Sequence, residues 1–243
     1  MKIALLGYGK MGMAIEAIAI ERGHDIVLKV DKHNADTCTV AELQMAEVAI
    51  EFSTPHTVLN NVNKCIEAKI PVVIGATGWY EKIEEIKEKT LTQNAAALWA
   101  SNFSVGVNLF FALNKKFAQL MQTHKDYAPV MHEIHHVHKL DAPSGTAISL
   151  AKDLMQVNGI KNWSCETIKH GESVPKVKTS ELKIFAERTD EVPGTHEVTY
   201  FSEVDEISIK HTAHSRKGFA LGAVLGAEWI KGRKGFYNFA ETL

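Results

Sequence analysis

The start of the chain places an apolar run, a glycine-rich turn and a helical pattern in direct succession. Ile3 to Leu6 is continuously apolar, and Met11 to Ile20 carries enough alanine, isoleucine and methionine to predict a packed helix. Six residues with the spacing G-x-G-x-x-G lie at the junction: Gly7, Tyr8, Gly9, Lys10, Met11 and Gly12. Glycines at this spacing permit a tight turn, approach of a pyrophosphate to the backbone and close packing of helix on strand. The feature predicts a sheet that binds a dinucleotide at its edge.

The alternation of strand and helix continues to about residue 104. Further strands are predicted at Ile26 to Val30, Val48 to Phe52, Val72 to Ile74 and Ala95 to Ala100. Helical patterns are found at Val58 to Ala68, Tyr80 to Lys89 and Val105 to Met121. Such alternation is typical of a parallel sheet with right-handed crossovers, so we predict an α/β fold with a Rossmann-type dinucleotide-binding domain.

Beyond about residue 128 the extended segments are no longer separated by regular helices. These segments are Val130 to Val137, Leu182 to Glu187, Glu197 to Phe201 and Glu206 to Lys210. Only Ser144 to Gln156 interrupts them with a helical pattern, and Phe219 to Ile230 is helical again. We therefore expect a second, α+β domain with a mixed sheet over residues 105–211, and a discontinuous first domain made of residues 1–104 and 212–243.

An acidic residue follows the second predicted strand. Asp31 lies 19 residues after Gly12 (31 minus 12), where a carboxylate accepts a hydrogen bond from a ribose hydroxyl of NADH. Lys32, the next residue, could instead pair with the 2′-phosphate of NADPH. The choice between NADH and NADPH therefore stays open. A glycine turn beside a surface aspartate is the plain alternative. Two loops that follow other strands, residues 53–55 and 75–78, are candidates for the nicotinamide side.

The densest group of ionisable side chains lies between residues 132 and 139. If the strand continues through this segment, Glu133, His135 and Lys139 share one face, and His132, His136 and His138 share the other. A histidine and a lysine on one face are a plausible pair for proton delivery at neutral pH. The following Pro-Ser-Gly-Thr, residues 143–146, predicts a helix start whose free N–H groups could hold a carboxylate.

Two other interpretations of the histidines compete with catalysis. Imidazoles on opposite faces of a strand do not converge, and no carboxylate or cysteine follows at an established ligand spacing, so we expect no metal site. Histidines that are simply hydrogen-bonded in a polar core are the second alternative. The catalytic interpretation is favoured because lysine, histidines and a helix start occur together.

Charge and composition exclude several classes of protein. The 27 basic and 29 acidic residues nearly balance, which argues against a nucleic-acid or anionic-membrane partner. No apolar stretch is long enough to span a bilayer. The three cysteines, Cys38, Cys65 and Cys165, form no CxxC pair and indicate a reducing compartment, so we expect a cytoplasmic protein.

With these residues described, the chain resembles the 4-hydroxy-tetrahydrodipicolinate reductase family over nearly its whole length. The segment EIHHVHKLDAPSGTA, residues 133–147, is similar to the family's E-x-H-H-x-x-K-x-D-A-P-S-G-T-A at every fixed position. Supporting segments are EFSTP at 51–55, GATGW at 75–79, ASNFSVGVN at 100–108, and Arg188, Gly194 and His196 in their spacing. Two positions depart from the family: the first glycine turn is one residue shorter than in many members, and Asp190 stands where glycine is frequent.

The resemblance implies a role for individual residues. His135 would be the acid-base histidine and Lys139 the proton donor, while His136, Gly145 and Thr146 would bind the substrate. Cofactor contacts would fall on residues 7–12, on Asp31 and Lys32, and on two later groups: Gly75, Ala76, Thr77, Ala100, Ser101, Asn102 and Phe103. It further implies a small dicarboxylate substrate, NADH or NADPH as cofactor, and a homotetramer.

The resulting hypothesis is hydride transfer to C4 of a cyclic imine, followed by protonation by His135 or Lys139. Two rivals remain at this point. One is an amino-acid dehydrogenase on the same two-domain plan, such as one acting on aspartate. The other is a nucleotide-binding sensor or structural protein that has lost turnover, because a fold alone does not prove activity.

Overall fold

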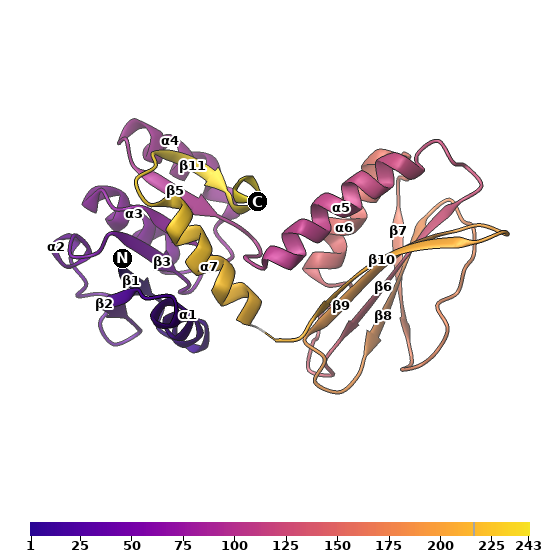
Figure 1. The fold of residues 1–243 in the computed structure, drawn as a ribbon, viewed down its shortest axis with the longest axis horizontal. Coiled ribbons are helices and arrows are strands. Elements are labelled where there is room, and N and C mark those ends of the chain that lie inside the picture. Colours follow the sequence, from indigo (N-terminus) through magenta and orange to yellow (C-terminus); the bar gives the residue numbers. More distant parts are fainter. Residues whose placement is uncertain (216) are drawn as a thin grey trace. The chain divides into compact units, whose positions relative to one another are not determined.

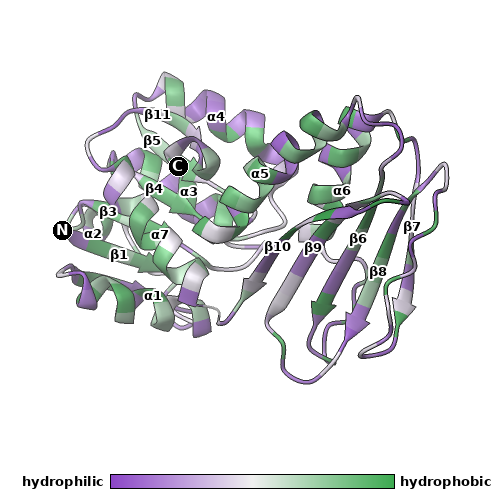
Figure 2. Ribbon diagram, turned by 45° about the vertical axis from the view of Figure 1, so that its right-hand side comes forward, coloured by the Kyte–Doolittle hydropathy of each residue, from purple (hydrophilic) through white to green (hydrophobic). Residues whose placement is uncertain are grey.

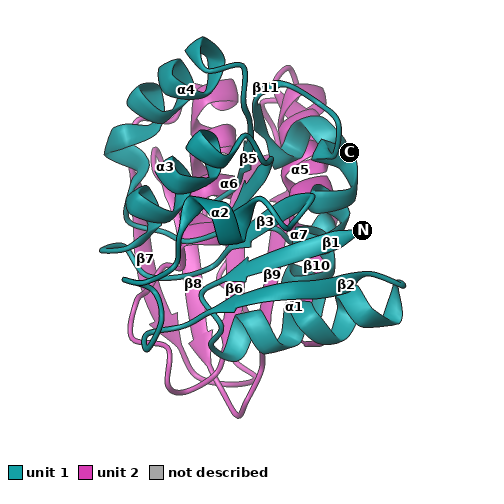
Figure 3. Ribbon diagram, turned by 90° about the vertical axis from the view of Figure 1, so that its left-hand side faces the viewer, with its two compact units in different colours: residues 1–105, 217–243 teal, residues 106–216 magenta. Residues whose placement is uncertain are grey.

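The computed structural model describes residues 1–215 and 217–243, which divide into two compact units (Figure 3). The first unit, in teal, comprises Met1–Val105 and Lys217–Leu243, and the second, in magenta, lies between them in the sequence. The predicted fold class is confirmed: one unit is a Rossmann-type α/β structure, and the other combines helices with a mixed sheet.

A six-stranded parallel sheet forms the centre of the first unit. Its spatial order is β11-β5-β4-β3-β1-β2, and every paired neighbour runs parallel. The strands are β1 (Lys2–Leu6), β2 (Asp25–Val30), β3 (Val48–Glu51), β4 (Val72–Ile74), β5 (Ala96–Trp99) and β11 (Gly235–Asn238). Since all six strands point the same way, the loops after them meet at one edge, where such sheets bind ligands.

Helices cover both faces of this sheet (Figure 1). One face packs against α1 (Lys10–Glu21) and α7 (Lys217–Ile230), and the other against α2 (Val40–Leu43), α3 (Val58–Ala68) and α4 (Ile83–Thr92). Two short 3-10 helices, η1 (Tyr80–Lys82) and η2 (Phe239–Thr242), complete the unit. The strands are apolar on both faces because both are covered, which explains the continuous apolar runs in the sequence.

The second unit is a five-stranded mixed sheet with two helices on one face. Its order is β10-β9-β6-β8-β7, in which β6 pairs antiparallel with β9 and parallel with β8. The elements are α5 (Val105–Met121), β6 (Ala128–His135), α6 (Gly145–Asn158), β7 (Trp163–Ile168), β8 (Leu182–Arg188), β9 (Gly194–Phe201) and β10 (Glu206–Ala213). Hydrophobic and polar residues alternate along several of these strands (Figure 2), and one apolar face packs under α5 and α6.

The structure corrects one sequence-based expectation and adds two strands that were not predicted. The strand predicted over Val130–Val137 ends at His135, so the alternation extrapolated to Lys139 is wrong. Residues 163–168, for which no strand was predicted, form the edge strand β7, which pairs with β8. The sequence also gave no sign of β11, a four-residue strand that adds to the edge of the first sheet beside β5.

Candidate functional sites

The three glycines of the first turn occupy three different environments. Gly7 has φ +97°, and a Cβ there would lie 2.4 Å from the carbonyl oxygen of Phe52. A Cβ on Gly12 would lie 2.6 Å from the carbonyl oxygen of Gly7, so this glycine allows α1 to pack on the turn. At Gly9 a Cβ would meet no atom within 4 Å. Two glycines are therefore required by packing, and the third leaves open space.

That open space leads to the start of α1. Gly9 is the N-cap of α1 and supplies no side-chain hydrogen bond, so the first N–H groups of the helix are not capped by it. An anion is stabilised at such a position by N–H donors and by the helix dipole. The turn therefore fits the pyrophosphate of a dinucleotide.

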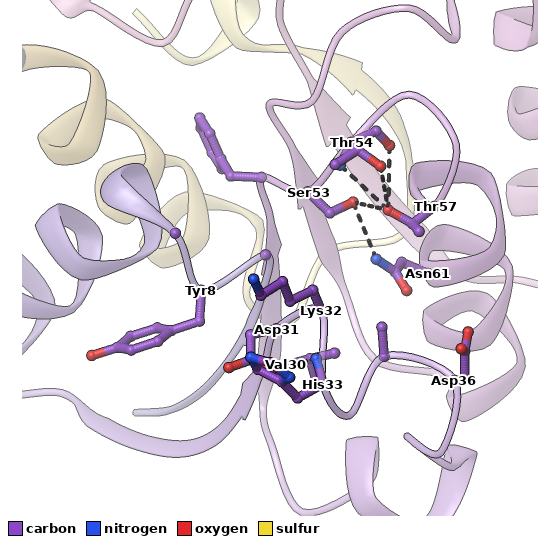
Figure 4. Close-up of a pocket in the computed structure, with 14 residues that line it drawn as sticks. Tyr8, Val30, Asp31, Lys32, His33, Asp36, Ser53, Thr54, Thr57 and Asn61 are labelled. Carbon is purple, nitrogen blue, oxygen red and sulfur yellow. Dashed lines mark hydrogen bonds between the residues drawn. The ribbon is translucent and has the colours of Figure 1, made fainter.

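A pocket of about 630 Å³ adjoins the turn (Figure 4). It includes five of the predicted cofactor residues: Gly7, Tyr8, Gly9, Asp31 and Lys32. Its other lining residues come from the loop after β2 and from the end of β3 through α3: Val30, His33, Ala35, Asp36, Phe52, Ser53, Thr54, Thr57 and Asn61. The loop after β3 was predicted as a candidate, but the participation of α3 was not.

Asp31 is held in place by its own loop. One carboxylate oxygen accepts the N–H of His33 at 2.7 Å, and the N–H of Asp31 donates to the side chain of Asn34 at 2.7 Å. The side chain of Lys32 extends into the middle of the pocket (Figure 4). Within the described residues Lys32 has no ion-pair partner, so its ammonium can pair with an incoming anion.

Three predicted cofactor residues at the start of α1, Lys10, Met11 and Gly12, do not line this pocket, and neither do those that follow β4 and β5. Gly75 packs against the ring of Phe52, since a Cβ on Gly75 would lie 2.1 Å from that ring. The carbonyl of Ala76 accepts the indole N–H of Trp79 at 2.9 Å, which fixes the loop that contains Thr77. The ring of Phe103 is buried against Phe239, so this side chain belongs to the core.

In the second unit, Glu133 and His135 project from the same face of β6 and are both buried. One Glu133 oxygen accepts the N–H of Ser144 at 3.0 Å, and the other accepts from the Arg188 guanidinium at 2.9 Å. The Nδ1 atom of His135 lies 3.8 Å from Glu133. The carboxylate therefore joins three elements, β6, β8 and the start of α6.

Ser144 connects this carboxylate to a second imidazole. Its hydroxyl caps α6 by accepting the N–H of Ala147 at 3.1 Å, and its oxygen lies 3.0 Å from Nε2 of His196. Burial lowers the pKa of His196 to about 3, and the neighbouring His135 acts in the same direction. His196 is therefore neutral at neutral pH, and its Nε2 can accept the Ser144 hydroxyl hydrogen.

His135 is neutral at neutral pH for a similar reason. Burial lowers the pKa of His135 to about 4 against the opposing charge of Glu133, and the charges of Lys139 and Arg188 add to the lowering. The ring packs against Gly194, where a Cβ would lie 3.1 Å from Nε2. The positive charge of Lys139 therefore acts on the His135 imidazole.

Lys139 lies in a turn that follows β6. Its N–H donates to the carbonyl of His136 at 3.1 Å, and its ammonium contacts both oxygens of Asp141 at 2.8 and 2.9 Å. Arg188 donates to the carbonyl of Asp141 at 2.7 Å and so anchors the same turn. Lys139 therefore lies after the end of β6 and not, as the strand alternation predicted, on the same strand face as His135.

Two of the predicted substrate residues, Gly145 and Thr146, form the start of α6. Gly145 is exposed, and a Cβ there would meet no atom within 4 Å, while Thr146 is half-buried. His136 is half-buried, and its Nδ1 is a buried atom with no hydrogen-bond partner in the described part of the chain. An open helix start of this kind suits a carboxylate.

Glu133, His135 and His196 place ligand-type atoms within 4.8 Å of one another, a convergence that sequence reasoning missed. His196 is 61 residues away from His135 in the chain (196 minus 135), on the antiparallel neighbour of β6. Both Glu133 oxygens already accept hydrogen bonds, from Ser144 and from Arg188. This carboxylate is therefore used to organise the protein, which argues against a metal ligand.

Among the described residues, no helix combines the length and the apolar character needed to cross a bilayer. The fold and the two sites define a class: a two-unit α/β protein with a Rossmann-type nucleotide pocket and a second unit that carries a buried histidine-carboxylate network. Sequence profiles narrow this class, since residues 1–103 match dihydrodipicolinate reductase, N-terminus, and residues 106–243 match dihydrodipicolinate reductase, C-terminus. The chain belongs to the dihydrodipicolinate reductase family.

Individual relatives agree with this assignment. The chain is 43% identical to the 4-hydroxy-tetrahydrodipicolinate reductase of Christiangramia forsetii over 100% of its own length and 98% of the relative. It is 30% identical to the enzyme of that name from Neisseria meningitidis serogroup B, over 94% and 83% of the two chains.

Solved structures with low sequence identity confirm the fold. The dipicolinate-bound dihydrodipicolinate reductase from Paenisporosarcina sp. TG-14 matches with a TM-score of 0.77 at 20% identity, covering 100% of this chain and 99% of that one. The amine dehydrogenase from Mycobacterium smegmatis matches less closely, with a TM-score of 0.56 at 11% identity and coverage of 99% and 95%.

Proposed function

We propose that this protein is a 4-hydroxy-tetrahydrodipicolinate reductase, which uses NADH or NADPH to form tetrahydrodipicolinate in the diaminopimelate route to lysine. The observation that carries the proposal is the group formed by His135, Lys139 and the open start of α6 at Gly145, on a chain that belongs to this family. The relatives named above support the same activity.

The substrate would be a small dicarboxylate held in the second unit. The ammonium of Lys139, the side chain of His136 and the N–H groups of Gly145 and Thr146 would pair with its carboxylates. Because Lys139 already contacts Asp141, a substrate carboxylate would compete with that residue for the ammonium. The neighbouring solved structure, described as bound to dipicolinate, supports this substrate class.

The cofactor would lie along the edge of the first sheet. Residues 7–12 would hold the pyrophosphate, and the loops at Gly75–Thr77 and Ala100–Phe103 would face the nicotinamide. Asp31 would accept from a ribose hydroxyl and Lys32 would pair with a 2′-phosphate, which is why either cofactor is expected. When bound, the reduced nicotinamide supplies the hydride for C4 of the cyclic imine.

Lys139 would donate the proton that completes the reduction. His135 is neutral at neutral pH, because its pKa is lowered to about 4 by burial, so in the resting protein it carries no extra proton to give. The Lys139 ammonium does carry one, and its pairing with Asp141 holds it in a defined position. His135 would then orient the substrate.

We further expect a cytoplasmic homotetramer in which residues 105–211 supply both substrate-binding and subunit contacts, and residues 1–104 and 212–243 bind the cofactor. Analytical ultracentrifugation of the purified protein tests the subunit number.

The decisive experiment supplies substrate from the preceding synthase and follows the absorbance of reduced cofactor. Wild-type protein should consume NADH or NADPH, while folded His135→Gln and Lys139→Ala variants should lose most of the turnover. Near-normal turnover in both variants would remove these residues from the chemistry. Oxidation of aspartate would identify the amino-acid dehydrogenase instead, and cofactor binding with no turnover on either substrate would identify a sensor.

A further inference from the structure

Glu51 is a fully buried acid at the end of β3, directly beneath one wall of the cofactor pocket. It lies between Leu6 of β1 and Ile74 of β4 in the sheet. One of its oxygens accepts the N–H of Ser53 at 3.1 Å, the hydroxyl hydrogen of Ser53, and an amide hydrogen of Asn61 at 3.2 Å. A single carboxylate oxygen therefore fixes the loop that leaves β3 and the helix that follows it.

From Ser53 the hydrogen bonds continue to the pocket surface, and Figure 4 shows those among Ser53, Thr54, Thr57 and Asn61. The Thr57 hydroxyl donates to the Ser53 oxygen at 2.8 Å, and the Thr54 hydroxyl lies 3.0 Å from that of Thr57. Asn61 also donates to the Ser53 oxygen at 3.3 Å. Ser53, Thr54, Thr57 and Asn61 all line the pocket. The Ser53 hydroxyl hydrogen is directed to Glu51. The carboxylate therefore sets the donor-to-acceptor direction of this series of hydrogen bonds.

The second oxygen of Glu51, Oε2, is buried without a hydrogen-bond partner in residues 1–215 and 217–243. Burial raises the pKa of this carboxyl to about 6. A glutamine at this position would offer the same acceptor without a buried charge, so an ionisable group is a poor choice for stability alone. Perturbed acids of this kind are concentrated at functional sites.

We propose that Glu51 is a positioning residue of the cofactor pocket, and that cofactor binding is coupled to the ionisation of this buried carboxyl. The inference rests on the proposed assignment of the pocket to NADH or NADPH. Glu51 touches no ligand in this proposal and acts through Ser53 and Thr57.

The coupling has a defined sign. Ionised Glu51 is a strong acceptor that draws the hydroxyl hydrogens inward, which leaves oxygen lone pairs on the pocket wall for donors such as ribose hydroxyls. A protonated carboxyl accepts more weakly, so the wall is less ordered. Cofactor should therefore favour the ionised form, and by reciprocity its binding should release protons near pH 6.

Other ionisable groups near Glu51 act differently. Cys65 of α3 faces it, and burial raises the pKa of that thiol so that it stays neutral. Leu6 and Ile74, its neighbours in β1 and β4, carry no charge. On the pocket side lie Asp31, Lys32, His33 and Asp36.

The test is to titrate NADH into the full-length protein by calorimetry, from about pH 8 to about pH 5, in two buffers of different ionisation enthalpy. For the wild type we expect the Kd to rise at least about fivefold toward low pH, with proton release on binding. Glu51→Gln should bind more weakly at high pH, change little with pH, and release fewer protons. Glu47→Gln removes an exposed acid that pairs with Lys231, and should follow the wild type.

The outcomes separate the two proposals. If NADH binds wild type but Glu51→Gln keeps the same pH dependence and proton release, Glu51 has no positioning role. If neither NADH nor NADPH binds at any pH, the assignment of the pocket itself is wrong. Should Glu51→Gln fail to fold, Ser53→Ala keeps the acid but breaks its connection to Thr57, and it should also lose the pH dependence. An unchanged profile in folded Ser53→Ala would overturn the inference.

Discussion

The carboxylate of Glu133 accepts the backbone N–H of Ser144 at 3.0 Å, so the strand that ends in His135 is joined directly to the start of α6. The other oxygen of the same carboxylate pairs with Arg188 of β8. The proposed proton-transfer residues and the proposed carboxylate-binding turn are therefore positioned by one buried group.

Glu133→Gln should destabilise the protein, because Arg188 would lose its charged partner in a buried setting. Removing one member of such a pair typically lowers the free energy of unfolding by about 3 kcal/mol. Urea denaturation followed by circular dichroism measures this change. Glu191→Gln, at an exposed acid that pairs with His138, is the matched control and should change stability little. Equal stabilities for the two variants would contradict the role given to Glu133.

The pH dependence of turnover should distinguish Lys139 from His135 as the proton donor. Since the pKa of His135 is lowered to about 4, this imidazole stays neutral above about pH 5, and its titration should produce no change in kcat/KM near pH 6.5. Lys139→Ala should reduce kcat by about 100-fold or more, and more than His135→Gln does. A larger loss in His135→Gln, or a turnover that falls as His135 deprotonates near pH 6.5, would assign the proton to the histidine.

Gly12→Ala should change the stability of the protein, whereas Gly9→Ala should change its affinity for NADH. A Cβ at Gly12 would lie 2.6 Å from the Gly7 carbonyl oxygen, so Gly12→Ala should lower the free energy of unfolding by about 1–3 kcal/mol. A Cβ at Gly9 meets nothing, and φ of −102° suits alanine, so Gly9→Ala should leave stability within about 0.5 kcal/mol. The added methyl would occupy the space that a pyrophosphate approaches, and NADH affinity should fall about tenfold. Thermal unfolding and NADH fluorescence titration measure the two effects, and unchanged affinity in Gly9→Ala would refute the pyrophosphate assignment.

Much of the fold followed from local sequence patterns. Helices α3 and α5 lie at the predicted residues, because their apolar positions recur with helical spacing. Edge strands were harder to predict. β7 consists only of half-buried and exposed residues, and β11 is half-buried along its length. Such strands are identified by the partner to which they add, and the sequence does not reveal that partner.

The candidate sites were predictable where the contacts are local. Lys139 and Asp141 are two residues apart, whereas the contact between Ser144 and His196 spans 52 residues and depends on strand pairing. Asp190, which replaces a frequent glycine of the family, has φ +43° and accepts the N–H of Val137 with its carbonyl. Asp tolerates this left-handed conformation better than most residues, so the departure keeps the turn.

Glu51 should also leave a signature in stability that is independent of any ligand. Its pKa is raised from 4.5 to about 6, so its contribution to stability is complete below about pH 4.5 and is lost as the pH rises through 6. A shift of this size corresponds to about 2 kcal/mol for a fully buried group. The difference in unfolding free energy, Glu51→Gln minus wild type, should therefore increase by about 2 kcal/mol between about pH 4 and about pH 8.

The difference between variants is the quantity to measure, because other groups act in the opposite direction. The pKa values of His135 and His196 are lowered by burial, so these imidazoles destabilise the fold as the pH falls and mask Glu51 in the wild-type curve alone. Both histidines are unchanged in Glu51→Gln, and their effects cancel in the subtraction. Urea unfolding at a series of pH values provides the data. A difference that stays constant across the series would mean that the Glu51 carboxyl titrates normally, and it would remove the physical basis for coupling this acid to cofactor binding.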